Sequence, residues 1–157
     1  MLDLTRCEPG QLQLVDRVVT DLLTKSTRLR SDDVMIVGAR CRDLLQRALG
    51  YRFDLRVTSD IDLGLAVSNW SAYEELTTNL RPVGDTGIRY VVANVPADLM
   101  PFGPVEDPPG TVKPAARRET MSVWGFTAVF SAAPRLPLPG GSTVRIPTVA
   151  GYAALKR

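Results

Sequence analysis

The sequence predicts an α/β (α+β) fold in which a mixed β-sheet carries helices on at least one face. Two observations support this class. Short apolar runs rich in β-branched residues alternate along the chain with segments of helical periodicity. Nine of the twelve prolines lie between Pro96 and Pro139, which predicts a Pro-rich β arm. A length of 157 residues, 45% of them hydrophobic, suits a single domain over residues 1–157.

Two helices and a buried strand are expected near the N-terminus. Apolar residues recur at helical spacing over residues 12–25, which predicts an amphipathic helix. Val34–Val37 is a fully apolar run that stops at Gly38, as is typical of a buried strand. Residues 40–49 then predict a second helix, and Gly50 is placed to end it.

A second buried strand is expected over residues 60–67, followed by a helix. Ser71 and Glu74 have the spacing of a capping box at the start of this helix, and Pro82 closes it. Trp70 and Tyr73 then lie on its apolar stripe, so we interpret them as core aromatics rather than as a base-stacking platform. Further elements expected toward the C-terminus are strands over residues 88–93, 96–102, 122–130, 136–138 and 143–146, and a helix capped by Thr148.

The composition excludes several kinds of chemistry. The chain has no histidine, so it contains neither a Ser-His-Asp triad nor a histidine zinc site. Cys7 and Cys41 are too few for a disulfide framework, which favours reduced thiols in a cytoplasmic protein. We expect no membrane association, because no apolar run is long enough to span a bilayer. The formal charge of +2 neither requires nor excludes a nucleic-acid partner.

Three aspartates are the candidate catalytic and metal-binding residues. Asp60 and Asp62 are two apart in a predicted strand, so their carboxylates share one face. Asp98 lies in a similar strand-like frame, and a neighbouring strand would bring it alongside them. Two such charges about 4 Å apart repel by about 4 kcal/mol at an effective dielectric near 20, and Mg²⁺ or Mn²⁺ removes that repulsion. Strand-end caps or a solvated pair are the alternative reading.

A glycine turn supplies a candidate phosphate site. Gly38 and Ala39 stand where the first strand turns into a helix, and small residues there let backbone N–H groups approach a phosphate. Arg40 and Arg42 follow and are candidates for direct phosphate contacts, or else part of a solvated basic surface. A phosphate cradle followed by an acid pair is the pattern of a nucleotide site.

These segments resemble nucleotidyltransferases of the AbiEii/AbiGii toxin-related family, within the DNA polymerase β-like superfamily. Residues 37–45, Val-Gly-Ala-Arg-Cys-Arg-Asp-Leu-Leu, are similar to the family's first motif. Residues 56–62, Arg-Val-Thr-Ser-Asp-Ile-Asp, resemble the second and most specific motif. The resemblance continues in residues 96–103, which match the segment of the third carboxylate, and in residues 121–126 and 153–156.

The resemblance implies a nucleotidyltransferase fold that transfers NMP from an NTP to a hydroxyl acceptor, with RNA or tRNA as acceptor. It also implies a toxin–antitoxin setting with a cognate partner protein. Asp60 and Asp62 would hold both metal ions, and Asp98 would bind the catalytic ion and help activate the attacking hydroxyl. The implied nucleotide-binding residues are Gly38, Ala39, Arg40, Arg42, Thr58 and Lys156.

Two departures from the family pattern keep a second interpretation open. Ala39 replaces the serine common at the turn, which removes one phosphate contact. The family continues beyond the lysine motif into a helical part, and we expect that part to be absent here because the sequence ends at Arg157. The alternative is therefore an NTP-binding or partner-binding module without turnover, antitoxin-like or regulatory. An apolar surface left by the missing helices would then pair with a second copy of the chain as a homodimer.

Residues 107–157 carry seven Lys or Arg and two acids, a surplus that suits a polyanionic acceptor or an ordinary solvated surface.

Overall fold

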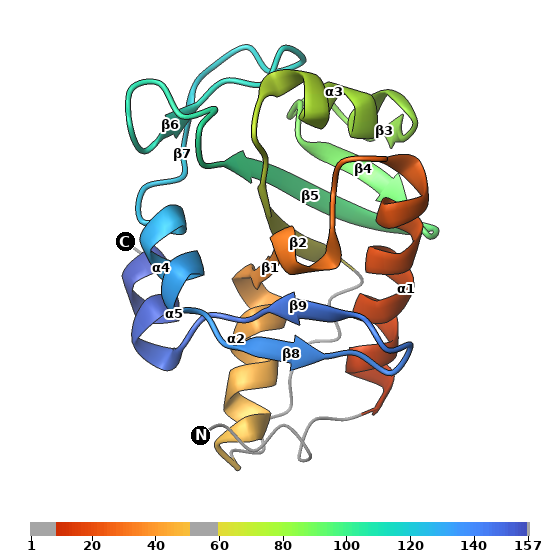
Figure 1. The fold of residues 1–157 in the computed structure, drawn as a ribbon, viewed down its shortest axis with the longest axis vertical. Coiled ribbons are helices and arrows are strands. Elements are labelled where there is room, and N and C mark those ends of the chain that lie inside the picture. The colour runs from red at the N-terminus through yellow and green to blue at the C-terminus, as the bar shows by residue number, and fades with distance from the viewer. Residues whose placement is uncertain (1–8, 51–59, 157) are drawn as a thin grey trace.

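Seven strands form one mixed sheet, and the helices pack against it (Figure 1). The computed structural model describes residues 9–50 and 60–156, and the structural statements below concern these residues. The strands of the large sheet are β1 (Val34–Val37), β2 (Ile61–Ala66), β3 (Arg81–Pro82), β4 (Arg89–Val92), β5 (Val95–Phe102), β8 (Arg135–Pro137) and β9 (Thr143–Arg145). Their order is β3-β4-β5-β2-β1-β9-β8. Two short strands, β6 (Thr111–Val112) and β7 (Met121–Ser122), form a separate pair.

The strands of the large sheet run in both directions. β2 pairs with β5 in parallel and with β1 antiparallel, while β1 pairs with β9 in parallel. The pairs β3–β4, β4–β5 and β8–β9 are antiparallel. The predicted mixed sheet is therefore confirmed, and its two longest strands, β2 and β5, lie side by side near its middle.

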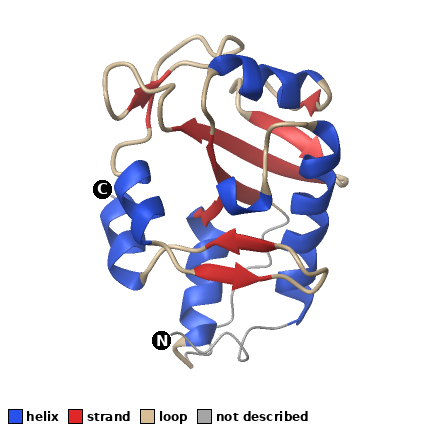
Figure 2. Cartoon of the chain, in the orientation of Figure 1, coloured by secondary structure: helices blue, strands red, loops and turns tan. Residues whose placement is uncertain are grey.

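Helices cover the sheet from two sides (Figure 2). They are α1 (Pro9–Lys25), α2 (Gly38–Ala48), α3 (Trp70–Thr78), α4 (Phe126–Ala132) and α5 (Val149–Leu155), and a 3₁₀ turn, η2, spans Ser31–Asp33. Figure 1 shows α1 and α3 together on one side of the sheet and α4 and α5 together on the other. Within the described part of the chain, no helix is long and apolar enough to cross a membrane.

Alternation along β2 explains how the sheet separates its core from its polar side. Ile61, Leu63 and Leu65 are at most 1% exposed, whereas Asp62 between them is only partly buried. Gly64 lies on the same side as Asp62, and the rings of Phe102 and Phe126 pack so closely there that a Cβ would lie 3.2 and 3.3 Å from them. The two aromatic rings therefore cover this face of the sheet at Gly64, and polar side chains occupy the same face at the N-terminal end of β2.

Several predicted elements are confirmed. The strand Val34–Val37 has the expected bounds, and the strands expected over residues 88–93 and 96–102 are β4 and β5, which form a hairpin with Ala93 and Asn94 at positive φ in its turn. Thr148 caps α5 by accepting a hydrogen bond from the N–H of Gly151 at 3.0 Å. Cys41 is a fully buried thiol, as expected, and burial raises its pKa to about 12.

Two local predictions are wrong. Residues 122–130 do not form an edge strand: β7 ends at Ser122, and α4 begins at Phe126 after Gly125 turns with φ 84°. The buried residues of this segment, Val123, Phe126 and Val129, are each three apart, which is a helical spacing. Helix α3 is capped by Asn69, whose side chain accepts a hydrogen bond from Ala72 N–H at 2.9 Å, and not by Ser71.

The buried hydroxyl of Tyr73 provides a test of the packing between α3 and the sheet. Tyr73 is 2% exposed and donates a hydrogen bond to the backbone carbonyl of Leu99 at 2.9 Å. We expect Tyr73→Phe to lower the free energy of unfolding by about 1 kcal/mol, because a buried hydrogen bond is lost. Urea denaturation measures this change. Tyr152→Phe is the matched control and should cost nothing, because the buried Tyr152 hydroxyl has no hydrogen-bond partner among the described residues.

Candidate functional site

Strand register places the candidate acids in a row across the sheet. In the parallel pairing of β2 with β5, Asp62 lies opposite Asp98. In the antiparallel pairing of β4 with β5, Arg89 lies opposite the same Asp98. On the other side of β2, Asp62 lies opposite Val37, the last residue of β1. The row therefore runs from Arg89 through Asp98 and Asp62 to the start of α2, and it joins residues from four strands.

Arg89 is a cation of the row that contacts the acids directly. Its Nε lies 2.8 Å from Asp98 Oδ1 and its Nη2 lies 3.2 Å from Asp98 Oδ2, so the contact is bidentate. Its Nη1 also lies 3.5 Å from Asp60 Oδ2. Hydrogen bonds to Asp98 and the charge of its carboxylate raise the pKa of Arg89. One guanidinium thus holds two of the three predicted acids.

Asp62 is the acid with the most unfavourable surroundings. Burial and the negative charge of Asp98 raise its pKa to about 6, although Arg89 opposes the shift. Asp60 and a hydrogen bond to the Asp98 side chain add smaller contributions in the same direction. The positive charge of Arg89 therefore compensates the row only in part, and Asp62 would gain from a further cation.

Gly38 lies directly beneath the carboxylate of Asp62. A Cβ at Gly38 would clash with Asp62 Oδ2 and would lie 3.0 Å from its Cγ. The backbone of Gly38 also has φ 67°, a left-handed conformation that favours glycine. The turn from β1 into α2 and the position of Asp62 therefore depend on the same missing side chain. This agrees with the predicted small-residue turn, which begins α2 at Gly38 itself.

Two of the three arginines of α2, Arg40 and Arg42, are engaged within the protein. Arg40 is 7% exposed, and burial lowers its pKa while the charge of Asp43 opposes that shift. Arg42 contacts Asp43 Oδ1 through Nε at 3.1 Å and Nη2 at 3.0 Å, and Asp43 is 2% exposed. The interpretation of Arg40 as part of a solvated surface is therefore wrong. Their predicted phosphate contacts stay a prediction.

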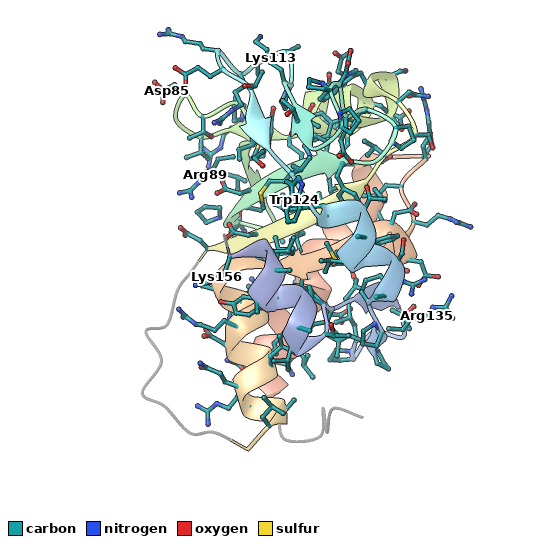
Figure 3. The ribbon with its side chains drawn as sticks, turned by 90° about the vertical axis from the view of Figure 1, so that its left-hand side faces the viewer. Asp85, Arg89, Lys113, Trp124, Arg135 and Lys156 are labelled. Carbon is teal, nitrogen blue, oxygen red and sulfur yellow. The ribbon has the colours of Figure 1, made fainter. Side chains whose placement is uncertain are left out.

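The remaining nucleotide-binding candidates are less closely tied to the row. Lys156 is exposed at the end of α5, with its Nζ 5.5 Å from the centre of the Tyr152 ring. In Figure 3, Lys156 and Arg89 lie on either side of the end of β2, the yellow strand, at which Asp62 is located. Ala39 is partly buried as the second residue of α2. Thr58 lies outside the described residues.

Two residues of this face were not predicted from the sequence. Arg89 was not singled out, although a two-residue turn at Ala93 and Asn94 implies that Arg89 pairs with Asp98. Trp124 is 56% exposed in the turn between β7 and α4, and Figure 3 shows it on the same face as Arg89 and Lys156. Trp124 lies in residues 121–126, which belong to the family resemblance, but the strand predicted over residues 122–130 assigns it no functional role. Trp70 and Tyr73, by contrast, pack edge-to-face with 5.8 Å between ring centres, as core aromatics.

The donor chemistry of the row suits a divalent cation. Among the described residues, no three His, Cys, Asp or Glu side chains converge as a metal-binding group in this arrangement, in which Arg89 contacts Asp60 and Asp98. Carboxylate oxygens are nevertheless the ligands that Mg²⁺ and Mn²⁺ prefer. Burial and then the negative charge of Asp98 raise the pKa of Asp62, and a nearby cation would oppose both effects, so these residues fit such an ion.

No protein-family model, curated protein or solved structure matches this chain. The interpretation of the site therefore depends on its geometry and charges.

The raised pKa of Asp62 predicts a dependence of stability on pH. Folded Asp62 keeps its proton to about pH 6, whereas the ordinary pKa is 3.8, so its ionisation destabilises the fold as pH rises through this interval. We expect Asp62→Asn to be more stable than the wild type above about pH 6, with the difference disappearing below about pH 4. Urea denaturation in EDTA across this range measures the difference. Asp85→Asn, at an exposed carboxylate before β4, should follow the wild-type curve; a pH-independent gap for Asp62→Asn would contradict the prediction.

The close approach of Gly38 and Asp62 predicts an unusual glycine substitution. Alanine in place of a helical glycine normally stabilises a protein, but Gly38→Ala should lower the free energy of unfolding by about 1–2 kcal/mol, because the left-handed backbone disfavours Cβ. The added clash with Asp62 should displace that carboxylate. Gly10→Ala in α1 is the control, since a Cβ there meets nothing within 4 Å. Equal effects of the two substitutions in thermal denaturation would argue against the geometry.

Proposed function

We propose that the protein is a metal-dependent nucleotidyltransferase with a DNA polymerase β-like fold, similar to the AbiEii/AbiGii family. The observation that carries the proposal is the placement of Asp62 and Asp98 opposite each other on neighbouring strands, directly above the glycine turn that begins α2. The acids have too little positive charge around them, and they lie next to the N-terminus of a helix. A metal–polyphosphate complex suits both features, because the metal ion brings positive charge to the acids and the phosphates bring negative charge to the helix N-terminus.

The nucleotide phosphates would bind at the start of α2. Gly38 opens an 11-residue helix whose N-terminus has no side-chain cap, and the N-terminus of a helix favours phosphate oxygens. Glycine at this position allows the polyphosphate to approach the backbone closely. Lys156 on the same face would neutralise part of the phosphate charge.

The reaction would proceed by in-line attack of an acceptor hydroxyl on the α-phosphorus of the NTP. The new P–O bond forms as the bond to pyrophosphate breaks, and the hydroxyl proton passes to the Asp98 carboxylate or to solvent. Two Mg²⁺ or Mn²⁺ ions, when bound, would stabilise the charge on the attacking and leaving oxygens. Asp60 and Asp62 would hold both ions, and Asp98 would bind the catalytic ion and orient the acceptor hydroxyl.

RNA or tRNA is the proposed acceptor, within a cytoplasmic toxin–antitoxin pair. The surplus of basic residues beyond Asp107 favours a polyanionic acceptor, and exposed Trp124 on the same face would stack on an unpaired base. An NTP-binding module without turnover is the second candidate, favoured by Ala39 in the turn, which has no hydroxyl for a phosphate.

Transfer of label from α-³²P-NTPs to total tRNA in the presence of Mn²⁺ tests the proposed activity. We expect Asp62→Asn to reduce transfer by at least about a hundredfold, because a charged group that acts on the transition state is lost. Asp85→Asn is the control and should retain wild-type transfer. If the wild type transfers no label but binds NTP and Mn²⁺ by calorimetry, the module without turnover is supported. Transfer that survives Asp62→Asn would overturn the assignment of the site.

A further inference from the structure

Arg89 makes contacts that the proposed reaction does not require. Its guanidinium uses Nε and Nη2 on the two oxygens of Asp98 and Nη1 on Asp60. The Arg89 side chain is 35% exposed and that of Asp98 is 21% exposed, so this ion pair lies at the partly covered edge of the acid row. Both oxygens of Asp98 are directed to one cation of the protein itself.

The ion pair is not needed to join the strands that carry it. β4 and β5 are consecutive strands of a hairpin, and the turn at Ala93 and Asn94 together with the backbone ladder already sets their register. A partly exposed ion pair adds little to such a hairpin. What Arg89 does supply is positive charge next to a row of carboxylates that repel one another.

We propose that Arg89 is an internal counter-ion that a divalent cation displaces from Asp60 and Asp98. The inference rests on the proposed function, since it takes the acid row as the metal site. The guanidinium and a metal ion need the same carboxylate oxygens, and their like charges repel, so both cannot occupy these oxygens together. Arg89 is thus a positioning residue: it holds the acids in place without metal and weakens metal binding by competing for them.

The inference predicts that removing the guanidinium strengthens metal binding. We expect Arg89→Gln to bind Mn²⁺ about tenfold more tightly than the wild type, a size usual for coupled binding equilibria. Arg89→Lys keeps the charge without the planar fork and should bind Mn²⁺ with intermediate affinity. Arg81→Gln is the matched control, because Arg81 is an exposed arginine on the adjacent strand β3 and pairs with Val91. Titration with Mn²⁺, followed by the electron paramagnetic resonance signal of the free ion, measures all four proteins.

Thermal denaturation gives a second readout that does not depend on activity. In EDTA, Arg89→Gln should unfold at a lower temperature than the wild type, because the acids lose their counter-charge. Saturating Mn²⁺ should raise its unfolding temperature by more than that of the wild type. Equal or weaker Mn²⁺ binding by Arg89→Gln, with no larger thermal shift, overturns the inference.

The two proposals fail in different ways. If the wild type binds Mn²⁺ and Asp62→Asn does not, the metal site stands, and an unchanged affinity in Arg89→Gln then removes only the role of Arg89. If neither the wild type nor Arg89→Gln binds Mn²⁺, both the metal-dependent function and the competition are wrong.

Discussion

Electrostatic repulsion between Asp62 and Asp98 is the constraint around which the functional face is arranged. Parallel pairing of β2 with β5 makes the two residues direct neighbours, so neither can move away without breaking the ladder. Arg89 enters the same row through the next strand and compensates part of the charge. Gly38 leaves room for the Asp62 carboxylate on the opposite side. The arginine and the glycine are each explained by the need to accommodate one partly buried carboxylate beside a second acid.

The stability that permits this arrangement comes from the other side of the same strands. Leu63 and Leu99 are fully buried, and each follows an aspartate of the row directly in sequence. Burial of such a side chain contributes about 1.5–3 kcal/mol, which is comparable with the cost of holding two acids together. Strand alternation thus couples the two functions: the residues that anchor β2 and β5 in the core also fix the direction of the acids.

Local features of this fold could be predicted from the sequence, and non-local ones only in part. The alternation of Asp60 to Leu63 placed the acids on one face, and the apolar run before Gly38 marked the turn. Adjacency of β2 and β5 depends on a parallel pairing across a long connection, which no local pattern specifies. The pairing of Arg89 with Asp98 could be predicted in principle, because the turn at Asn94 sets the register of the hairpin. The strand predicted over residues 122–130 is wrong because an apolar alternation of a few residues does not separate helix from strand.

The shared row also links proton binding, metal binding and folding stability. A cation on Asp62 and Asp98 would favour their charged forms and oppose the shift that burial and mutual repulsion produce in Asp62. Arg89 already compensates part of the negative charge of the row. Its guanidinium contacts Asp98 and Asp60, however, so among the contacts of the row Asp62 has no direct ion pair with it. The acid nearest to Gly38 is therefore the least compensated, and it is also the one closest to the helix terminus at which a polyphosphate would bind. In the proposed function, a metal–nucleotide complex would relieve the unfavourable charge of this site, so binding and stabilisation of the fold would increase together.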